Sequence, residues 1–557
     1  MKKIIILLML FIASFSFAQI ISDQDETNDE KQIERSKIDT LKQPEQTLLL
    51  KKLELFLKTK ENLENDFSLP HLVYSENFHL SSFFNPDVNI RKNGFTEIQS
   101  STGSLQKIQN FRNIYKAVYK PGNIFYEPLN YSLPVALTET YMGLGDNDMN
   151  NIAVSLMKGD AFGIPDLDLQ IDYLGEDGLW LSLENEISKN LRLYLVYDTG
   201  FARISFEHTT IDQRLSGMKN INSYLFLNSS ASYKVREYLL KVENKIVDLG
   251  MRFSADNYKI EEQFRKQSDV LQILVSKKLQ TANHKLTLSS ELIHADITNN
   301  DLSDQSTTIT TKQDSLYPIF FFDHESKIFA FKFGNTLTYQ NKNNYYLNSE
   351  ISKNIFTNLA IFTEYRTSAI DLKTSPSSIL ILDNRSNLGG GVKIDLPFVT
   401  TKFKLGQHII NDLNSVFYEL QNKLNFGLSQ NFKINFKTWL RKEQSNFLVK
   451  KDPNILTFPE WQTSDQLELT YNLPYKNAVK IGFKHIYHSA FTFYLEDPES
   501  QFTSDSHNLD AYFKLQITER FEIWADLINL TNTKTMFNNF SHPGTHINFN
   551  VHWIFVN

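Results

Sequence analysis

The sequence predicts an all-β protein: a large transmembrane antiparallel β-barrel of roughly 16 to 22 strands, preceded by a short N-terminal segment that is helical and irregular. Three observations support this prediction. The chain begins with an export signal, apolar and polar residues alternate along most of its length, and short polar turns alternate with longer polar loops. An exported chain with these features is typical of the barrels that cross outer membranes, which close on themselves because lipid leaves no partner for an open sheet edge.

Composition excludes several other classes of protein. The 557 residues are 41% hydrophobic and 13% aromatic, which is too apolar for a disordered chain. The chain has no Cys, so a disulfide framework, a thiolate zinc site and a Cys nucleophile are all excluded. Its 57 Lys and Arg residues against 64 Asp and Glu residues give a formal charge of -7, without the basic excess that neutralises phosphates. We therefore expect no nucleic-acid partner.

Residues 1–18 are predicted to be a cleaved signal peptide. Met1-Lys2-Lys3 is a positively charged start, residues 4–15 form an apolar run, and Ser16-Phe17-Ala18 is a small-x-small cleavage site. The run is shorter than the ~20 apolar residues of a membrane-spanning helix, so export is favoured over anchoring. Since no further run of ~18 apolar residues follows, the mature chain is expected to be an exported soluble protein or a barrel.

The segment before the barrel divides into two parts. Residues 19–66 are a polar linker followed by an amphipathic helix over 47–65, in which Leu49, Leu53 and Leu57 recur at helical spacing. This helix is expected to pack on its own chain or, as the alternative, to bind a periplasmic partner. Residues 67–132 carry scattered Pro and Gly without a clear period, so an irregular segment is predicted that lies in the periplasm or docks in the lumen.

Residues 133–557 are predicted to form the barrel, because their apolar period is two. Alternating segments run for 8 to 13 residues, and one example is the set Leu167, Leu169, Ile171 and Tyr173 between polar neighbours. Segments of this length suit the ~9–11 residues that a tilted strand needs to cross a bilayer. A soluble sandwich would show shorter strands with more Gly and Pro turns.

The connections support the same prediction. Outer-membrane barrels have short turns on the periplasmic side and long loops outside. We expect short turns at 188–190, 352–354, 429–430, 475–477 and 518–520, and longer loops at 296–315, 368–391, 443–465 and 496–506.

The last ~50 residues resemble the C-terminus of TonB-dependent receptor barrels. The resemblance is carried by the run 527–532 (Leu-Ile-Asn-Leu-Thr-Asn), a polar loop, Pro543-Gly544-Thr545, and a closing strand with an apolar face that ends at Trp553 and Phe555. The chain also resembles outer-membrane porins, which have a signal peptide and a barrel without a plug. Residues 19–132 show no plug pattern, and Thr545 stands where the receptors have Arg. The resemblance implies an outer-membrane barrel whose C-terminal strand is recognised by the barrel-assembly machinery.

Charged residues at water-facing positions are the candidate site. Asp166, Asp168 and Asp172 are predicted to share the lumen face of one strand, where they would favour cations or bind Ca²⁺. Neutralisation by nearby basic residues such as Arg192 is the alternative, which leaves an ordinary polar lumen. Lys433 and Lys437 lie at inward positions of another strand, where they would steer anions or balance the acidic side.

No chemistry beyond transport is predicted. A metal site needs three or four converging ligands, which the sequence does not establish for His542, His546 and His552, so these are interpreted as polar lumen or loop residues. No Gly-x-Ser-x-Gly elbow or phosphate loop is present, and we expect no enzyme, metal or cofactor. The main hypothesis is an outer-membrane porin that passes small solutes through a polar lumen, in contact with outer-membrane lipid. The alternative is a TonB-dependent receptor-like or surface-binding barrel with a closed lumen and no conductance.

Overall fold

We describe a computed structural model of the chain, and its description covers most of the predicted barrel. The residues that the structure describes are 51–56, 89–96, 115–120, 123–145, 150–177, 187–215, 231–260, 264–301, 309–328, 331–341, 344–369, 384–410, 413–445, 460–474, 477–489, 491–493, 501–503, 505–518, 520–531, 536–537, 540–541 and 545–556. The signal peptide predicted at 1–18 lies outside them.

The chain divides into two units, residues 1–61 and residues 62–557. In the first unit the described residues, 51–56, are helical and fall inside the helix expected over 47–65. Within the described parts of the chain, no helix has the length and apolar character that crossing a membrane requires.

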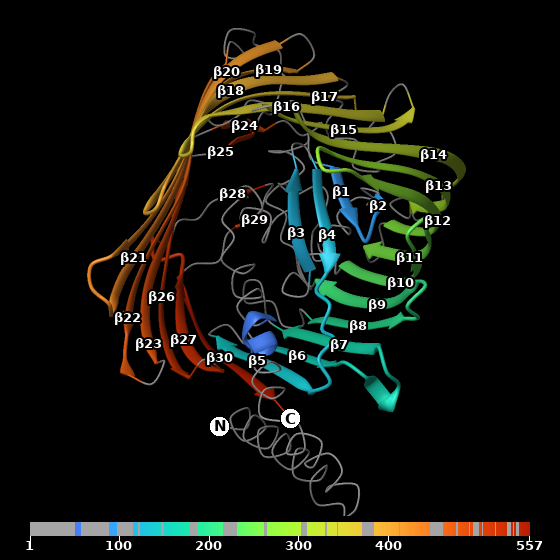
Figure 1. Ribbon diagram of the computed structural model, residues 1–557, viewed down its shortest axis with the longest axis horizontal. Helices are drawn as coiled ribbons and strands as arrows, with labels where there is room; N and C mark the ends of the chain where they lie inside the picture. The colour runs from blue at the N-terminus through green and yellow to red at the C-terminus, as the bar shows by residue number, and fades with distance from the viewer. Residues whose placement is uncertain are drawn as a thin grey trace, which may run out of the picture. The chain divides into compact units, whose positions relative to one another are not determined.

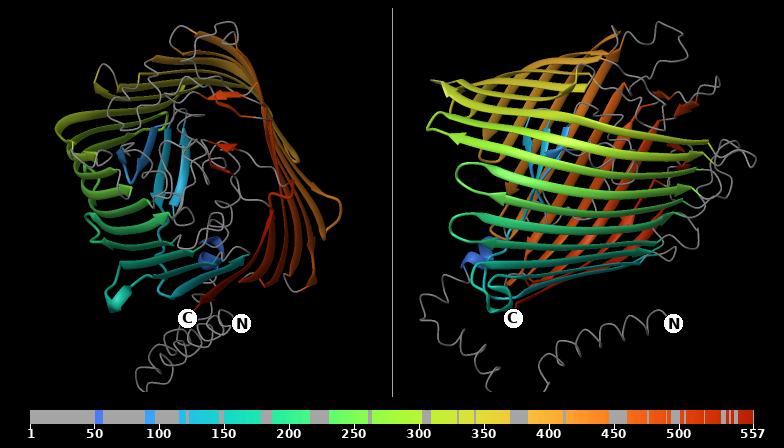
Figure 2. Two further views of the ribbon diagram at one scale, coloured as in Figure 1. Left: turned by 180° about the vertical axis from the view of Figure 1, so that it is seen from behind. Right: turned by 90° about the vertical axis from the view of Figure 1, so that its right-hand side faces the viewer.

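The second unit is a closed antiparallel barrel of 22 strands, as the alternating pattern predicts (Figure 1). The strands lie side by side with a common tilt (Figure 2). They are β5 (Leu137–Gly145), β6 (Asn150–Lys158), β7 (Leu167–Asp177), β8 (Ile187–Asp198), β9 (Arg203–Leu215), β10 (Ala231–Glu243), β11 (Asp248–Ile260), β12 (Phe264–Gln280), β13 (His284–Asp301), β14 (Ile309–Ile328), β15 (Phe331–Asn341), β16 (Asn344–Phe356), β17 (Leu359–Ala369), β18 (Asn384–Leu396), β19 (Val399–Ile410), β20 (Leu413–Gly427), β21 (Phe432–Ser445), β22 (Trp461–Asn472), β23 (Ala478–His488), β26 (Ser506–Thr518), β27 (Phe521–Ile528) and β30 (His546–Val556).

The last strand closes the barrel on the first. β30 pairs with β5 in a register that runs from Val556 opposite Leu137 to Asn548 opposite Gly145. At this seam the His552 ring lies between two carboxylates, with Nε2 at 2.7 Å from Oε1 of Glu139 on β5 and Nδ1 at 3.5 Å from Oε2 of Glu522 on β27. Each barrel strand therefore pairs with a strand on both sides, and the ring is closed; the first half of β14 extends beyond the end of β15 and, among the described strands, pairs there only with β13.

The inner and outer faces of the wall differ in the burial of their side chains, and the outer face exposes apolar ones. On β12, Val270, Gln272 and Leu274 are buried on the inner face, whereas Ile273 and Val275 on the outer face are 44% and 45% exposed. The same inversion, with large apolar side chains exposed outward, recurs on the neighbouring strands and produces an apolar outer belt. A soluble protein would bury these side chains against a second layer.

Short turns gather at one end of the barrel. Residues 357–358 join β16 to β17, 397–398 join β18 to β19, and 428–431 join β20 to β21, the last at the position that the sequence predicts. The turns predicted at 188–190 and 352–354 are wrong, because those residues lie inside β8 and β16. Both are polar triplets, and polar residues that line a lumen look like turn residues in sequence: Asn190, for example, is buried on the inner face.

A second, small sheet lies inside the ring of barrel strands (Figure 1). Its order is β2-β1-β4-β3, with β1 (Asn89–Lys92) parallel to β4 (Asn123–Pro128) and the other pairs, with β2 (Phe95–Thr96) and β3 (Tyr115–Lys120), antiparallel. It occupies the part of the chain where the sequence predicts an irregular segment, 67–132. Strands of two to six residues are too short to establish a period of two, which is why the pattern did not reveal them. Two further hairpins, β24 (Phe491–Phe493) with β25 (Gln501–Thr503) and β28 (Met536–Phe537) with β29 (Phe540–Ser541), lie in the long connections.

Candidate functional site: the ion-paired lumen wall

The tip of the β1–β2 hairpin contacts the barrel wall. Lys92 pairs with Phe95 across a two-residue loop, Asn93-Gly94. Both loop residues have positive φ, 54° at Asn93 and 93° at Gly94, as a type I′ turn requires and as Asn-Gly favours. The tight turn directs the side chains of Lys92, Asn93 and Phe95 onto the inner face of β9 to β12.

Lys92 forms ion pairs with two glutamates of the wall. Its Nζ lies 2.8 Å from Oε1 of Glu207 on β9 and 2.9 Å from Oε1 of Glu237 on β10, and all three side chains are 1% exposed. The Asn93 amide donates to Oε2 of Glu207 at 3.0 Å. Buried charges of this kind persist only when paired and hydrogen-bonded, so the hairpin and the two glutamates depend on each other.

The ion pairs of Lys92 complete a row of buried charges that crosses five adjacent strands. From β7 to β11 the row contains Asp172, Arg192, Glu207, Glu237 and Arg252. Arg192 lies 2.9 Å from Asp172 and 3.4 Å from Glu207, and Arg252 lies 2.5 Å from Glu237. The wall alone supplies three carboxylates and two guanidinium groups, so the ammonium of Lys92 brings the cluster to electrical balance. We call these six residues the latch cluster.

An apolar contact lies beside the latch cluster. The Phe95 ring is fully buried and packs with Leu239 of β10 and Leu274 of β12. Gly250 of β11 makes room for it, because a Cβ at this position would come within 2.7 Å of the Phe95 ring. The hairpin tip is therefore held by the ion pairs of Lys92 and by the close apolar packing of Phe95.

The chain that leads from the small sheet into the barrel also contacts the wall. The Tyr194 hydroxyl of β8 donates to Oδ1 of Asn130 at 3.2 Å. One residue further on, the Tyr131 hydroxyl donates to the carbonyl oxygen of Val135 at 2.7 Å. Burial raises the pKa of Tyr131 above its ordinary value, so this hydroxyl stays protonated and remains a donor.

The structure brings together two of the residues that the sequence singled out. Asp172 and Arg192 are direct cross-strand neighbours on β7 and β8 and form a buried ion pair. Asp168 lies on the same strand but at its short-turn end, opposite Val196. Asp166 is not on the strand face: it is exposed in the turn before β7, with φ of 60°, and its N–H donates to Oδ1 of Asp160 at 2.9 Å. Positive φ interrupts the period of two there, so a count of alternating positions fails at this residue.

Lys433 and Lys437 lie elsewhere in the barrel, on β21. Lys433 is exposed opposite Thr470, and Lys437 lies opposite Gln466 and Lys423. They share a strand face with Trp439, which is buried on the inside, so both lie on the lumen side of β21. They take no part in the latch cluster.

Sequence reasoning missed Lys92, Glu207 and Glu237. The signal for the hairpin was present, because Asn-Gly is a strong indicator of a two-residue hairpin. No pattern in the sequence connects Lys92 with glutamates that lie more than a hundred residues away. Among the described residues, no group of three or more His, Asp or Glu side chains is arranged to hold a metal ion.

Comparison with known proteins identifies the fold. No protein-family model matches the chain, and no curated protein matches its sequence. Solved structures do match. The FrpB iron transporter from Neisseria meningitidis is 10% identical with a TM-score of 0.61, covering 85% of this chain and 93% of that one. The ferric yersiniabactin uptake receptor FyuA from Yersinia pestis is 12% identical with a TM-score of 0.62, covering 85% and 89%.

A third matching structure is described as that of an outer-membrane protein. The ferripyoverdine receptor of the outer membrane of Pseudomonas aeruginosa is 11% identical with a TM-score of 0.60, covering 84% of this chain and 80% of that one. Identities this low establish the architecture and leave function open. The chain therefore has the closed 22-stranded fold of the outer-membrane receptor barrels.

Proposed function

We propose that the protein is an outer-membrane receptor whose lumen is closed by the β1–β4 sheet and opens when that sheet is released from the wall. The observation that carries the proposal is the latch cluster, in which Lys92 of the sheet neutralises the excess carboxylate of the wall. Removing one partner of a buried ion pair leaves the other charges uncompensated, so Lys92 and the wall glutamates are expected to stay paired or to separate together.

The expectation of a passive porin is not supported. A porin needs a water-filled lumen along its length. Here the inner faces of β7 to β13 carry side chains that are buried, among them Gln170, Tyr194, Thr209 and Ile293. The structures that match in fold are described as receptors and an iron transporter. Both observations favour the closed-lumen alternative.

The ligand class follows from the same likeness. The matching proteins are named for iron or for ferric siderophores, so we propose a bulky iron chelate as the ligand, bound at the long-loop end. The remaining expectations belong to this proposal. Residues 1–18 direct export, the C-terminal strand β30 is read by the barrel-assembly machinery, and the helix over 47–65 serves as a contact for a periplasmic partner that releases the sheet. Asp168, Lys433 and Lys437 line the path beyond the latch cluster and set its charge preference.

Planar-bilayer conductance tests the proposal directly. The purified mature chain should be silent, and a chain that lacks residues 19–130 should conduct. Steady conductance by the full chain would restore the porin reading. Silence of both forms would exclude a lumen that the N-terminal segment closes.

Ligand binding forms the second arm of the test. Cells that express the full chain in an iron-limited strain without other receptors should take up a ferric siderophore, and cells that express the truncated chain should lose energy-dependent uptake. Conductance after truncation without binding of any ferric chelate would keep the closed lumen and exclude the proposed ligand class.

A further inference from the structure

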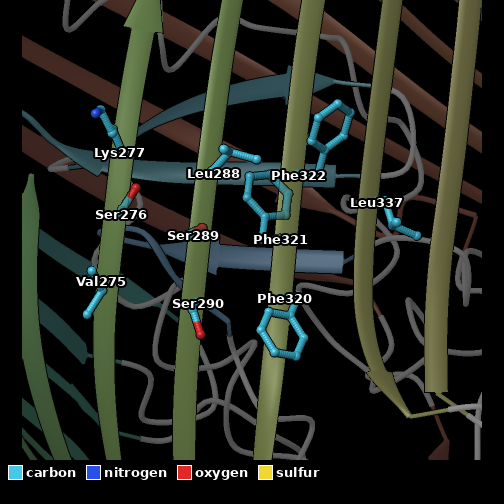
Figure 3. A pocket seen from close by; sticks show the side chains of 10 residues that line it. All are labelled: Val275, Ser276, Lys277, Leu288, Ser289, Ser290, Phe320, Phe321, Phe322 and Leu337. Carbon is cyan, nitrogen blue, oxygen red and sulfur yellow. The ribbon is translucent and has the colours of Figure 1, made fainter.

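An apolar groove crosses the outer face of the barrel over β12 to β15. Its volume is about 360 Å³, and Figure 3 shows its lining with the small sheet behind the wall. Its apolar outward side chains are Val275, Leu288, Phe320, Phe322 and Leu337, and Ser290 and Lys277 also line it. Phe320 is 51% exposed and Leu288 is 44% exposed, so both side chains project outward from the sheet and the groove lies between them. A volume in the range of about 300–1,000 Å³ is that of small-ligand sites.

Three nitrogen-bearing side chains border the groove on its short-turn side. Lys277 on β12 pairs with Leu288 of the groove, and His324 on β14 lies two residues beyond Phe322 toward the turn. The His284 ring, at the start of β13, stacks on His324 with centroids 5.8 Å apart. Within the described part of the chain, the Lys277 ammonium and the two imidazole rings have no acidic or hydrogen-bonding partner.

The Lys277 ammonium and the His284 and His324 rings lie beside a groove that faces lipid, where a polar group is stable only with a polar partner. An ammonium group at the edge of an apolar belt extends toward the interface and seeks an anion there. Toward the long-loop end, the same outer faces carry Asp269 opposite Asp296, and beyond them Arg265 opposite Lys259, so both signs of charge occur there. Next to the groove, the nearest charged group on the short-turn side is the Lys277 ammonium, so this side attracts an anion.

We propose that this groove is a binding site for one anionic phospholipid of the inner leaflet. An acyl chain occupies the hollow between Phe320, Phe322 and Leu288, and the phosphate lies between the Lys277 ammonium and the His284–His324 pair. The short turns of outer-membrane barrels face the periplasm, where the leaflet is made of phospholipid, so head group and acyl chain meet the site in the correct order. The inference concerns the outer face and does not depend on what passes through the lumen.

Native mass spectrometry of the full chain in detergent tests the proposal, with phosphatidylglycerol, phosphatidylethanolamine and lipid A as the three probes. We expect the protein to retain phosphatidylglycerol in preference to the other two. Lys277→Gln should weaken phosphatidylglycerol binding about fivefold, the effect of one basic side chain at a membrane surface. It should weaken phosphatidylethanolamine binding by less, because the ethanolamine ammonium already compensates the phosphate charge. Leu288→Trp, which fills the groove, should weaken binding of both phospholipids.

Lys442→Gln is the matched control. Lys442 also lies near a lipid-facing aromatic, with its Nζ 4.6 Å from the Trp461 ring, but it has Glu460 as a partner and lies toward the long-loop end of β21. This variant should bind phosphatidylglycerol as the wild type does. Equal loss in the Lys442 and Lys277 variants, no preference for phosphatidylglycerol, or preferential retention of lipid A would each overturn the proposal.

Discussion

Replacement of Lys92 by Met tests the latch cluster most directly. Met keeps much of the side-chain volume and removes the charge, so two buried guanidinium groups would then face three buried carboxylates. Breaking a buried ion pair by removing one partner costs about 3–5 kcal/mol. Because Glu207 keeps Arg192 at 3.4 Å and Glu237 keeps Arg252 at 2.5 Å, we expect the lower end of that range.

The assay is single-channel recording of the mature full-length variant. A change of about 3 kcal/mol shifts the equilibrium between a docked and a released sheet by roughly 150-fold. Where the wild type is closed, the Lys92→Met variant should show frequent openings whose size approaches that of the chain without residues 19–130. The folded barrel should remain, since its wall pairs are untouched.

The partner variant supplies the control. Combining Lys92→Met with Glu237→Gln leaves two buried cations and two buried carboxylates, and the amide oxygen introduced at position 237 can still accept from Arg252, so closure should return in part. A double-mutant cycle over the two positions should give a coupling of about 2 kcal/mol or more. If the Lys92→Met variant is as silent as the wild type while the truncated chain conducts, the ion pairs do not hold the lumen closed and the argument from charge balance fails.

Two further predictions use other contacts. Gly250→Val should displace Phe95, whose ring would lie 2.7 Å from the new Cβ, and should increase openings without any change in charge; unchanged conductance would show that the ring has room to move. His552→Leu should remove the imidazole between Glu139 and Glu522, leaving Lys514 at 3.1 Å from Glu522, and lower the temperature at which the barrel unfolds in a gel-shift assay. Lys353→Leu should not, because Lys353 lies outward over the Phe331 ring and forms no ion pair with another described residue.

The sequence predicts the barrel far better than it predicts the latch cluster. A period of two is a local property that repeats with every strand, so segments such as Leu191 to Tyr197 disclose both faces of the wall without any knowledge of the neighbours. The cross-strand pair of Asp172 and Arg192 can be predicted for the same reason, since the two residues lie on consecutive strands. The ion pairs of Lys92 cannot be predicted in this way, because its partners lie more than a hundred residues further along the chain and depend on where the short hairpin docks.

The latch cluster also explains why the small sheet was hard to recognise as a lumen element. An independent domain carries its own apolar core and therefore a visible pattern, but strands β1 to β4 are two to six residues long and the tip of the β1–β2 hairpin completes a core that belongs to the barrel wall: Phe95 is buried by Leu239 and Leu274, and Lys92 by Glu207 and Glu237. The hairpin tip is thus held by side chains of the wall, both at Lys92 and at Phe95. A releasable closure needs such contacts, since breaking them frees the tip from the wall while the strand pairing of the barrel stays intact.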